Sequence, residues 1–499
     1  MSDKPTGDNR AEWKAYWEQQ GEAWRTEPEI AETRQAELRE RQLHNQDFPF
    51  KDMRLQRADI EWLLHTHTPV DLADAAQVDR KGLDLGGVQL GETEEYASID
   101  LSGLPLAGAD LSFAHLAGAD LKDVHLESAY LAGAHLEYAT ELREAHLAGA
   151  DLSFAHLAGA ELREAHLEGA HLDDAHLAGA DLQRVHLAGA HLKDADLAGA
   201  HLSFADLAGA DLMRAHLEGA DLTKAELASA HLMGAHLESA NLSDAHLAGA
   251  HLVYAHLAGA VLWKAHLAGA DLRGAFFDAA TQLDGVLLGT QEKLNLFADV
   301  RWGGVNLAVI EPQIRQLKQL GDELNARKLD DALKKAPKEQ RKNRLKERLD
   351  SWRAAVRANR QLAVALKDQG MNETADQFSY RARICQRHAY RLERKIGSYA
   401  GSWFLEMIAG YGFRPLRSFT AYLIIIFVFS VLFYITGSGH YNALDACVLS
   451  ITAFHGRGFF GSQIKPSDPQ GVIAACEAFI GLFIEIIFIA TFTRRFFGD

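Results

Sequence analysis

The stretch that decides the fold is Ala107–Leu126, which reads AGADLSFAHLAGADLKDVHL. Leucine recurs at every fifth position through most of residues 106 to 272, and one extra residue at Thr140–Glu141 shifts the phase. Alanine or another small residue stands two positions before most of these leucines. A period of five matches neither the 3.6 residues of a helical turn nor the two of a strand. We therefore expect a chain that turns a corner every five residues, with the leucine and the small residue both pointing inward.

This pattern resembles the pentapeptide-repeat family, whose repeat is A-(D/N)-L-X-X. The resemblance implies a right-handed β-helix, or β-solenoid, of square cross-section with four repeats per coil. The phase continues past the consensus to Phe277 and Leu307, and Leu85 and Leu90 look like early repeats. We therefore place the solenoid at residues 81–310.

Stacked coils have open ends, and we expect helical segments to cap them. Residues 1–80 supply one candidate cap, because Trp13 and Trp17 lie in a charged helical pattern. Residues 311–413 are highly charged and predict an α-helical adaptor that ends in an interfacial helix. Within it, Gly370 resembles the glycine that follows a helix C-cap.

Two apolar runs follow, Phe419–Tyr434 and Gly471–Phe492, with a short amphipathic stretch at Asn442–Phe454 between them. The N-terminus lacks the apolar region of a signal peptide, so we expect these runs to direct membrane insertion. Basic residues precede the first run and follow the second, which predicts a multi-pass protein of the inner (plasma) membrane with both termini in the cytoplasm. Aromatic and basic residues at the lipid interface would anchor these spans; the candidates are Trp403, Tyr411, Arg414, Arg417, Arg494 and Arg495. The alternative for the segment before residue 414 is a core helix of the adaptor.

Residues 414–499 form the expected pore domain, and about 415 to 496 resemble the two-transmembrane potassium-channel-like family. The resemblance implies an outer helix, a pore helix, a filter loop and an inner helix. It also implies a homotetramer, since one chain contributes a quarter of a filter. The aligned filter reads Phe454, His455, Gly456, Arg457, Gly458, whereas a potassium filter reads T-V-G-Y-G. We therefore expect a pore that is not potassium-selective.

Three charged residues leave the permeant ion open. A ring of Arg457 side chains facing the axis would repel cations. If Arg457 points backward it needs a buried acid, for which Glu477 is the candidate, and a third alternative places it at the outer surface. Glu485, in the second run, favours cations if it lines the cavity, or it is a protonated group packed between helices.

Histidines recur just before the inward leucine, at His146, His166 and His186 among others. Residues twenty apart would stack, and stacked imidazoles could bind Zn²⁺ or Ni²⁺ or respond to pH. Aspartate and glutamate fill the same solvent-facing position elsewhere, so we predict no metal site from the sequence.

The composition of the chain argues against several classes of function. A formal net charge of −17 argues against a nucleic-acid partner. Three scattered cysteines form no disulfide or metal pattern, and no motif supports an enzyme or a cofactor. We expect an ion channel in the lipid bilayer, with permeating inorganic ions and a possible protein partner on the solenoid. The alternative is a membrane-anchored scaffold or DNA-mimic binding protein without conduction.

Overall fold

A computed structural model of the chain describes residues 5, 9–20, 22, 25–44, 49–51, 53–66, 83–90, 99–138, 140–289, 293–334, 336–412, 415–437, 442–455 and 468–496. The chain divides into two compact units, Met1–Gly321 and Asp322–Asp499. The first contains the five-residue repeats and the second is helical.

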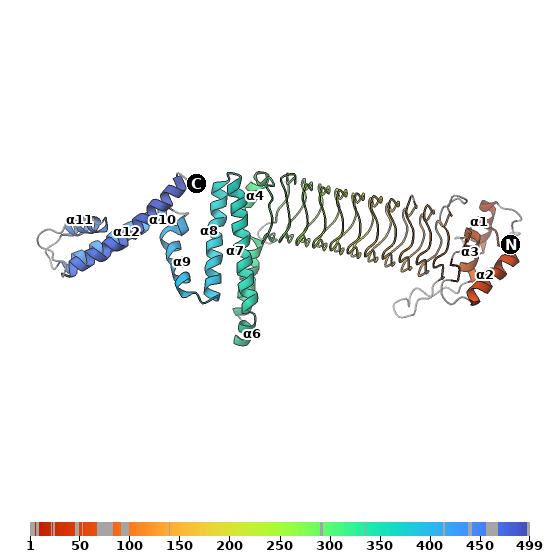
Figure 1. The fold of residues 1–499 in the computed structure, drawn as a ribbon, viewed down its shortest axis with the longest axis horizontal. Helices are drawn as coiled ribbons and strands as arrows, with labels where there is room; N and C mark the ends of the chain where they lie inside the picture. The colour runs from red at the N-terminus through yellow and green to blue at the C-terminus, as the bar shows by residue number, and fades with distance from the viewer. Residues whose placement is uncertain are drawn as a thin grey trace. The chain divides into compact units, whose positions relative to one another are not determined.

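The first unit is a solenoid of stacked coils (Figure 1). Residues in neighbouring coils pair in parallel, as in the series His146, His166 and His186, where each member follows the last by twenty positions. The amide of Leu147 donates to the carbonyl of His166 at 2.7 Å, and the amide of His166 donates back to Ala145 at 2.8 Å. Among the described residues this pairing consists of single-residue bridges instead of extended strands, because the chain turns a corner every five residues.

The core of the solenoid consists of the repeated leucine and the alanine two positions before it. Leu162 and Ala160 are both fully buried, and the same holds throughout the regular coils. Both expected inward positions are thus confirmed. Each coil buries its apolar side chains against the coils above and below, so a single coil would be unstable alone.

Each corner needs a left-handed backbone at the second residue after the inward leucine. Gly149 has φ of +66° there, and Phe154 has the same conformation with φ of +59°. For a non-glycine residue this left-handed conformation costs roughly 1–2 kcal/mol of conformational energy. The stacked backbone hydrogen bonds on either side of the corner hold it in place.

Two buried threonines accommodate extra residues in the repeat. In regular coils the corner amide, such as that of Gly149, donates to a carbonyl of the next coil. At the first phase shift the amide of Gly118 donates to Oγ1 of Thr140 at 2.9 Å, and that hydroxyl contacts the carbonyl of Leu116 at 3.2 Å. Thr281 contacts the carbonyl of Leu257 in the same way at 2.9 Å. A side chain therefore supplies the contact that the shifted backbone cannot make.

Helices cover the ends of the coil stack within this unit. At the N-terminal end lie α1 (Arg10–Gln19), α2 (Glu32–His44) and α3 (Arg57–Thr66). The buried guanidinium of Arg57 donates to the carbonyls of Asp100 at 3.1 Å and Ser102 at 3.0 Å. At the other end, η2 (Leu307–Val309) leads into α4 (Glu311–Gln316). There the amide of Leu288 donates to the side chain of Gln313 at 3.0 Å.

The second unit begins with helices of charged sequence. They are α5 (Gly321–Lys334), α6 (Lys338–Asn343), α7 (Leu345–Asp368) and α8 (Asn372–Leu392). The long helices α7 and α8 lie side by side (Figure 1). Between them Gly370 has φ of +80°, and the amide of Met371 donates to the carbonyl of Leu366 at 2.9 Å. This is the Schellman arrangement, and it confirms the expected glycine after the helix C-cap.

The chain continues through α9 (Ile396–Ala409) and η3 (Gly410–Gly412). The last three helices are α10 (Pro415–Thr436), α11 (Ala443–Phe454) and α12 (Pro469–Phe496). Their order of long, short and long helix matches the order expected from the two apolar runs and the stretch between them.

Candidate membrane-embedded site

Helices α10 and α12 are long and apolar enough to cross a membrane. Leu416–Thr436 has a mean hydropathy of 2.3, and Pro469–Ala490 has one of 2.4. Only 11% of the first apolar window and 22% of the second are buried within the chain. The core helix of a soluble protein would be mostly buried, so these surfaces need cover from lipid or from another chain.

Helix α11 packs against both long helices. Ala446 and Ala453 of α11 cluster with Phe433 of α10 and Ala474 of α12. A second cluster joins Phe454, at the end of α11, to Ile426 and Ile484. The three helices therefore form one packed group.

The close approach of α12 to the end of α11 depends on Gly481. A Cβ atom placed on Gly481 would lie 2.2 Å from the carbonyl oxygen of Phe454. Any side chain there would push the helices apart. Gly481 lies within the second apolar run, Gly471–Phe492.

The start of α11 is fixed by a capping box. The amide of Asp445 donates to Oδ1 of Asn442 at 2.9 Å, and the amide of Asn442 donates to the carboxylate of Asp445 at 3.4 Å. The two side chains satisfy backbone donors that the first turn leaves unpaired. Asp445 also places a negative charge at the positive end of the helix dipole.

A buried polar contact joins all three helices. The hydroxyl of Ser450, on α11, contacts the carbonyl of Ile426 at 3.0 Å and also contacts Oε1 of Glu477. Ser450 and Glu477 are both completely buried. The sequence pointed to Glu477 only as a candidate partner for Arg457, which lies outside the described residues. It gave no signal for Ser450, because Thr452 offers a hydroxyl on the same helix.

His455 lies where α11 ends and contacts both long helices. Its Nδ1 is 3.2 Å from Oε1 of Glu485 on α12, and its Nε2 is 3.1 Å from the hydroxyl of Tyr422 on α10. Glu485 is partly exposed within the single chain. Of the expected filter, Phe454 is buried beside Ile484, whereas Gly456, Arg457 and Gly458 lie outside the described residues.

The expected interface anchors fall into three groups. Trp403 on α9 is exposed. The hydroxyl of Tyr411 contacts that of Ser402 at 2.7 Å, and Arg417 donates to the carbonyl of Glu406 at 3.2 Å. Arg414 lies outside the described residues, and the side chains of Arg494 and Arg495 at the end of α12 are also not described. Their position relative to lipid stays a prediction.

Comparison with known proteins identifies the repeats. The family model of pentapeptide repeats matches in eight copies within residues 106–278. HetL, a pentapeptide repeat protein involved in heterocyst differentiation regulation from Nostoc sp. strain PCC 7120, is 30% identical, and the match covers 47% of this chain and 95% of HetL with a TM-score of 0.29. Rfr23 from Cyanothece 51142 is 31% identical over 23% of this chain and 63% of Rfr23, with a TM-score of 0.14.

A trypsin-treated form of QnrB1, a plasmid-mediated fluoroquinolone resistance protein, is 16% identical over 47% of this chain and 97% of its own, with a TM-score of 0.26. No curated protein matches the chain. The matched residues fall on the coils with buried leucine and alanine. The chain is therefore a pentapeptide-repeat protein with a helical region that carries two possible membrane spans.

Proposed function

We propose that the chain is one subunit of a homotetrameric ion channel in the inner membrane, with the solenoid and both termini in the cytoplasm. Residues 415–496 would form the pore. The observation that carries the proposal is the short helix α11, which packs between two helices of membrane-spanning length. Its 12 residues extend over about 18 Å, and the hydrocarbon core is about 30 Å thick.

A helix of this length cannot cross the bilayer. The segment that contains α11 would therefore enter the membrane and leave it on the same side. Irregular backbone at membrane depth is tolerated only where protein or a water-filled path surrounds it. One chain offers little such cover, because Leu444, Val448 and Ile451 of α11 are exposed. Copies of the same chain arranged around an axis would bury these side chains and enclose a path for ions.

The chemistry of the proposed path supports an unusual ion selectivity. Phe454 stands where a potassium filter has threonine, and its ring is buried against α10 and α12 instead of facing a path. Glu485 is the partly exposed acid nearest to the end of α11, through its contact with His455. Four such acids would attract cations, so we propose a cation path that does not select potassium.

The test is a current recording from the purified full chain in a planar bilayer. We expect unitary currents, and we expect Glu485→Gln to shift the reversal potential in a salt gradient by at least several millivolts. Glu347→Gln, which removes an exposed acid outside the apolar helices, is the matched control and should leave the reversal potential unchanged. A chain that remains monomeric in detergent and carries no current would favour the alternative of a membrane-anchored scaffold.

A further inference from the structure

One face of the solenoid carries a row of stacked imidazoles. His216, His236 and His256 occupy three consecutive coils and pair through successive backbone bridges. The ring centroids of His216 and His236 are 4.8 Å apart, and those of His236 and His256 are 4.7 Å apart. The rings are partly exposed, so they are accessible to an ion from solution.

Two glutamates lie beside this row. Oε1 of Glu218 is 3.1 Å from Nδ1 of His216 and 3.9 Å from Nδ1 of His236. Oε1 of Glu238 is 3.6 Å from Nδ1 of His236 and 3.2 Å from Nδ1 of His256. Each carboxylate therefore lies between the imidazoles of two neighbouring coils.

The second oxygen of each carboxylate has no hydrogen-bond partner among the described residues. Oε2 of Glu218 and Oε2 of Glu238 are shielded from solvent, and neither accepts a hydrogen bond from the described part of the chain. A shielded carboxylate oxygen without a partner is costly. A cation bound by the same carboxylate would offset part of this cost through its charge.

We propose that His216, Glu218, His236, Glu238 and His256 form a binding site for a divalent transition-metal ion of the zinc type. Tetrahedral zinc holds its nitrogen and oxygen ligands at about 2.0–2.2 Å, which places neighbouring ligand atoms about 3.3 Å apart. The four nitrogen-to-oxygen distances of this row, from 3.1 to 3.9 Å, bracket that separation. The rings of His216 and His236 are nearly parallel, with an interplanar angle of 6°. They would have to tilt away from this stacking for their in-plane lone pairs to meet at one ion, and their partial exposure leaves room for that movement.

The ligand set argues for zinc over magnesium or calcium. Two imidazoles and one carboxylate suit zinc, nickel or copper, whereas magnesium and calcium prefer oxygen ligands alone. Three protein ligands leave one zinc position for water. The row contains two overlapping ligand sets: His216, Glu218 and His236 form one, and His236, Glu238 and His256 form the other. An ion could bind to either set, and both include the imidazole of His236.

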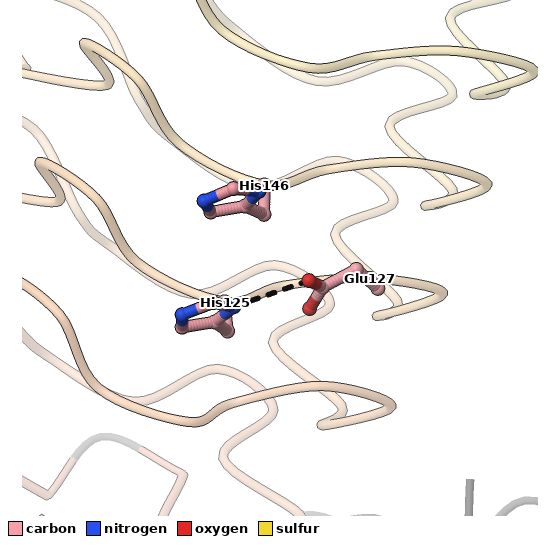
Figure 2. A group of neighbouring side chains, drawn as sticks. All are labelled: His125, Glu127 and His146. Carbon is pink, nitrogen blue, oxygen red and sulfur yellow. Dashed lines mark hydrogen bonds and ion pairs between the residues drawn. The ribbon is translucent and has the colours of Figure 1, made fainter. Parts of the chain in front are cut away.

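The same arrangement occurs at His125, Glu127 and His146 (Figure 2). Figure 2 shows the two rings stacked, with Glu127 beside the His125 ring. Oε1 of Glu127 is 3.1 Å from Nδ1 of His125. From the sequence, the imidazoles alone predict no metal site. The structure adds the acid two positions after the histidine, and this acid completes the ligand set.

The chain contains its own matched control. His231 and His251 also stack, with centroids 4.9 Å apart, but Met233 stands where the other row has glutamate. This pair has the imidazoles without the carboxylate. It should therefore bind zinc much more weakly than the row from His216 to His256.

The test is equilibrium dialysis of the purified full chain against zinc sulfate with excess magnesium chloride, with bound zinc measured by elemental analysis. We expect the triple variant His216→Asn, His236→Asn, His256→Asn to bind at least one zinc ion fewer per chain than wild type. Asn241 shows that asparagine is accommodated at this position of a coil. Circular dichroism verifies that the variant keeps its fold.

Two further variants make the result specific. The double variant Glu218→Gln, Glu238→Gln should weaken zinc binding at this row at least tenfold, whereas His231→Asn, His251→Asn should bind as much zinc as wild type. Unchanged binding in the folded triple variant would overturn the proposal. Equal losses in the triple variant and the control would also overturn it, since they would indicate unspecific binding to surface histidines.

Discussion

At the scale of single residues, the first phase shift of the solenoid depends on Thr140. Its hydroxyl accepts the amide of Gly118 and contacts the carbonyl of Leu116. Thr140→Val keeps the shape but leaves both backbone groups without this partner, so we expect it to destabilise the solenoid by about 1–3 kcal/mol. Urea unfolding followed by circular dichroism measures the change. Thr140→Ser should retain most of the stability, and equal urea midpoints for the valine variant and wild type would contradict the assignment.

A second residue-scale prediction concerns His388, whose ring stacks on Trp352 with centroids 4.2 Å apart. Burial, aided by Arg387, lowers the pKa of His388 to about 4, although Asp330 opposes the change. The unfolded chain, with a pKa near 6.5, binds the proton more readily. The stability contribution is therefore complete above about pH 6.5 and is lost as the pH falls toward 4.

We expect this loss to amount to about 1–2 kcal/mol, after allowance for partial exposure of the ring. In a variant that lacks Cys447 and Cys476, the buried thiol of Cys385 in the same helix reports the unfolding of α7 and α8. Urea titrations at pH 7 and pH 4.5, each followed by a short thiol-labelling pulse at one fixed pH, measure it. His388→Phe keeps an aromatic ring against Trp352 and should flatten the pH dependence. If the stability of His388→Phe still falls between pH 7 and pH 4.5 as in wild type, a group other than His388 causes the loss.

The sequence predicted some of these residues and not others, for a physical reason. The phase shift at Thr140 is visible because it interrupts a regular pattern. Its bond to Gly118 is not visible, since it depends on the contact between neighbouring coils. Ser450 and Glu477 likewise meet only because two helices pack across 27 residues of sequence.

At the scale of elements, the coil is the unit that the sequence predicts best. Its pattern is local and repeats, so the inward positions follow from the spacing alone. The helix order after residue 415 also follows from hydropathy. The close approach at Gly481 is different, because the glycine shows its role only when the end of α11 lies against it.

The inward leucines give the element-scale prediction. Leu202 is fully buried in the coil stack, whereas Phe204, two positions later, is 52% exposed at a corner. Leu202→Ala leaves a cavity among closely stacked coils and should cost about 2–5 kcal/mol. Phe204→Ala removes a larger side chain and should cost far less, since most of the ring is already in solvent. Chemical unfolding of both variants provides the comparison, and similar losses for the two would contradict the inward assignment.

At the scale of the whole molecule, the charges around the apolar helices predict the orientation in the membrane. Arg417 lies before the main part of α10, and Arg494 and Arg495 lie near the end of α12. The only arginine and lysine residues in the segment 437–468 are Arg457 and Lys465. The positive-inside rule predicts that α10 leads out of the cytoplasm and that α12 returns to it, so we expect α11 to begin on the outer side.

Thiol labelling of intact cells tests this orientation in a variant that lacks Cys385, Cys447 and Cys476. A membrane-impermeant reagent should label Ala443→Cys, because Ala443 is exposed at the start of α11. The same reagent should reach Ser398→Cys, which is exposed on α9, only after the cells are opened. Labelling of Ser398→Cys in intact cells would place the adaptor outside the cytoplasm and reverse the orientation. Since the proposed function places the solenoid and both termini in the cytoplasm, that result would also contradict the proposed function.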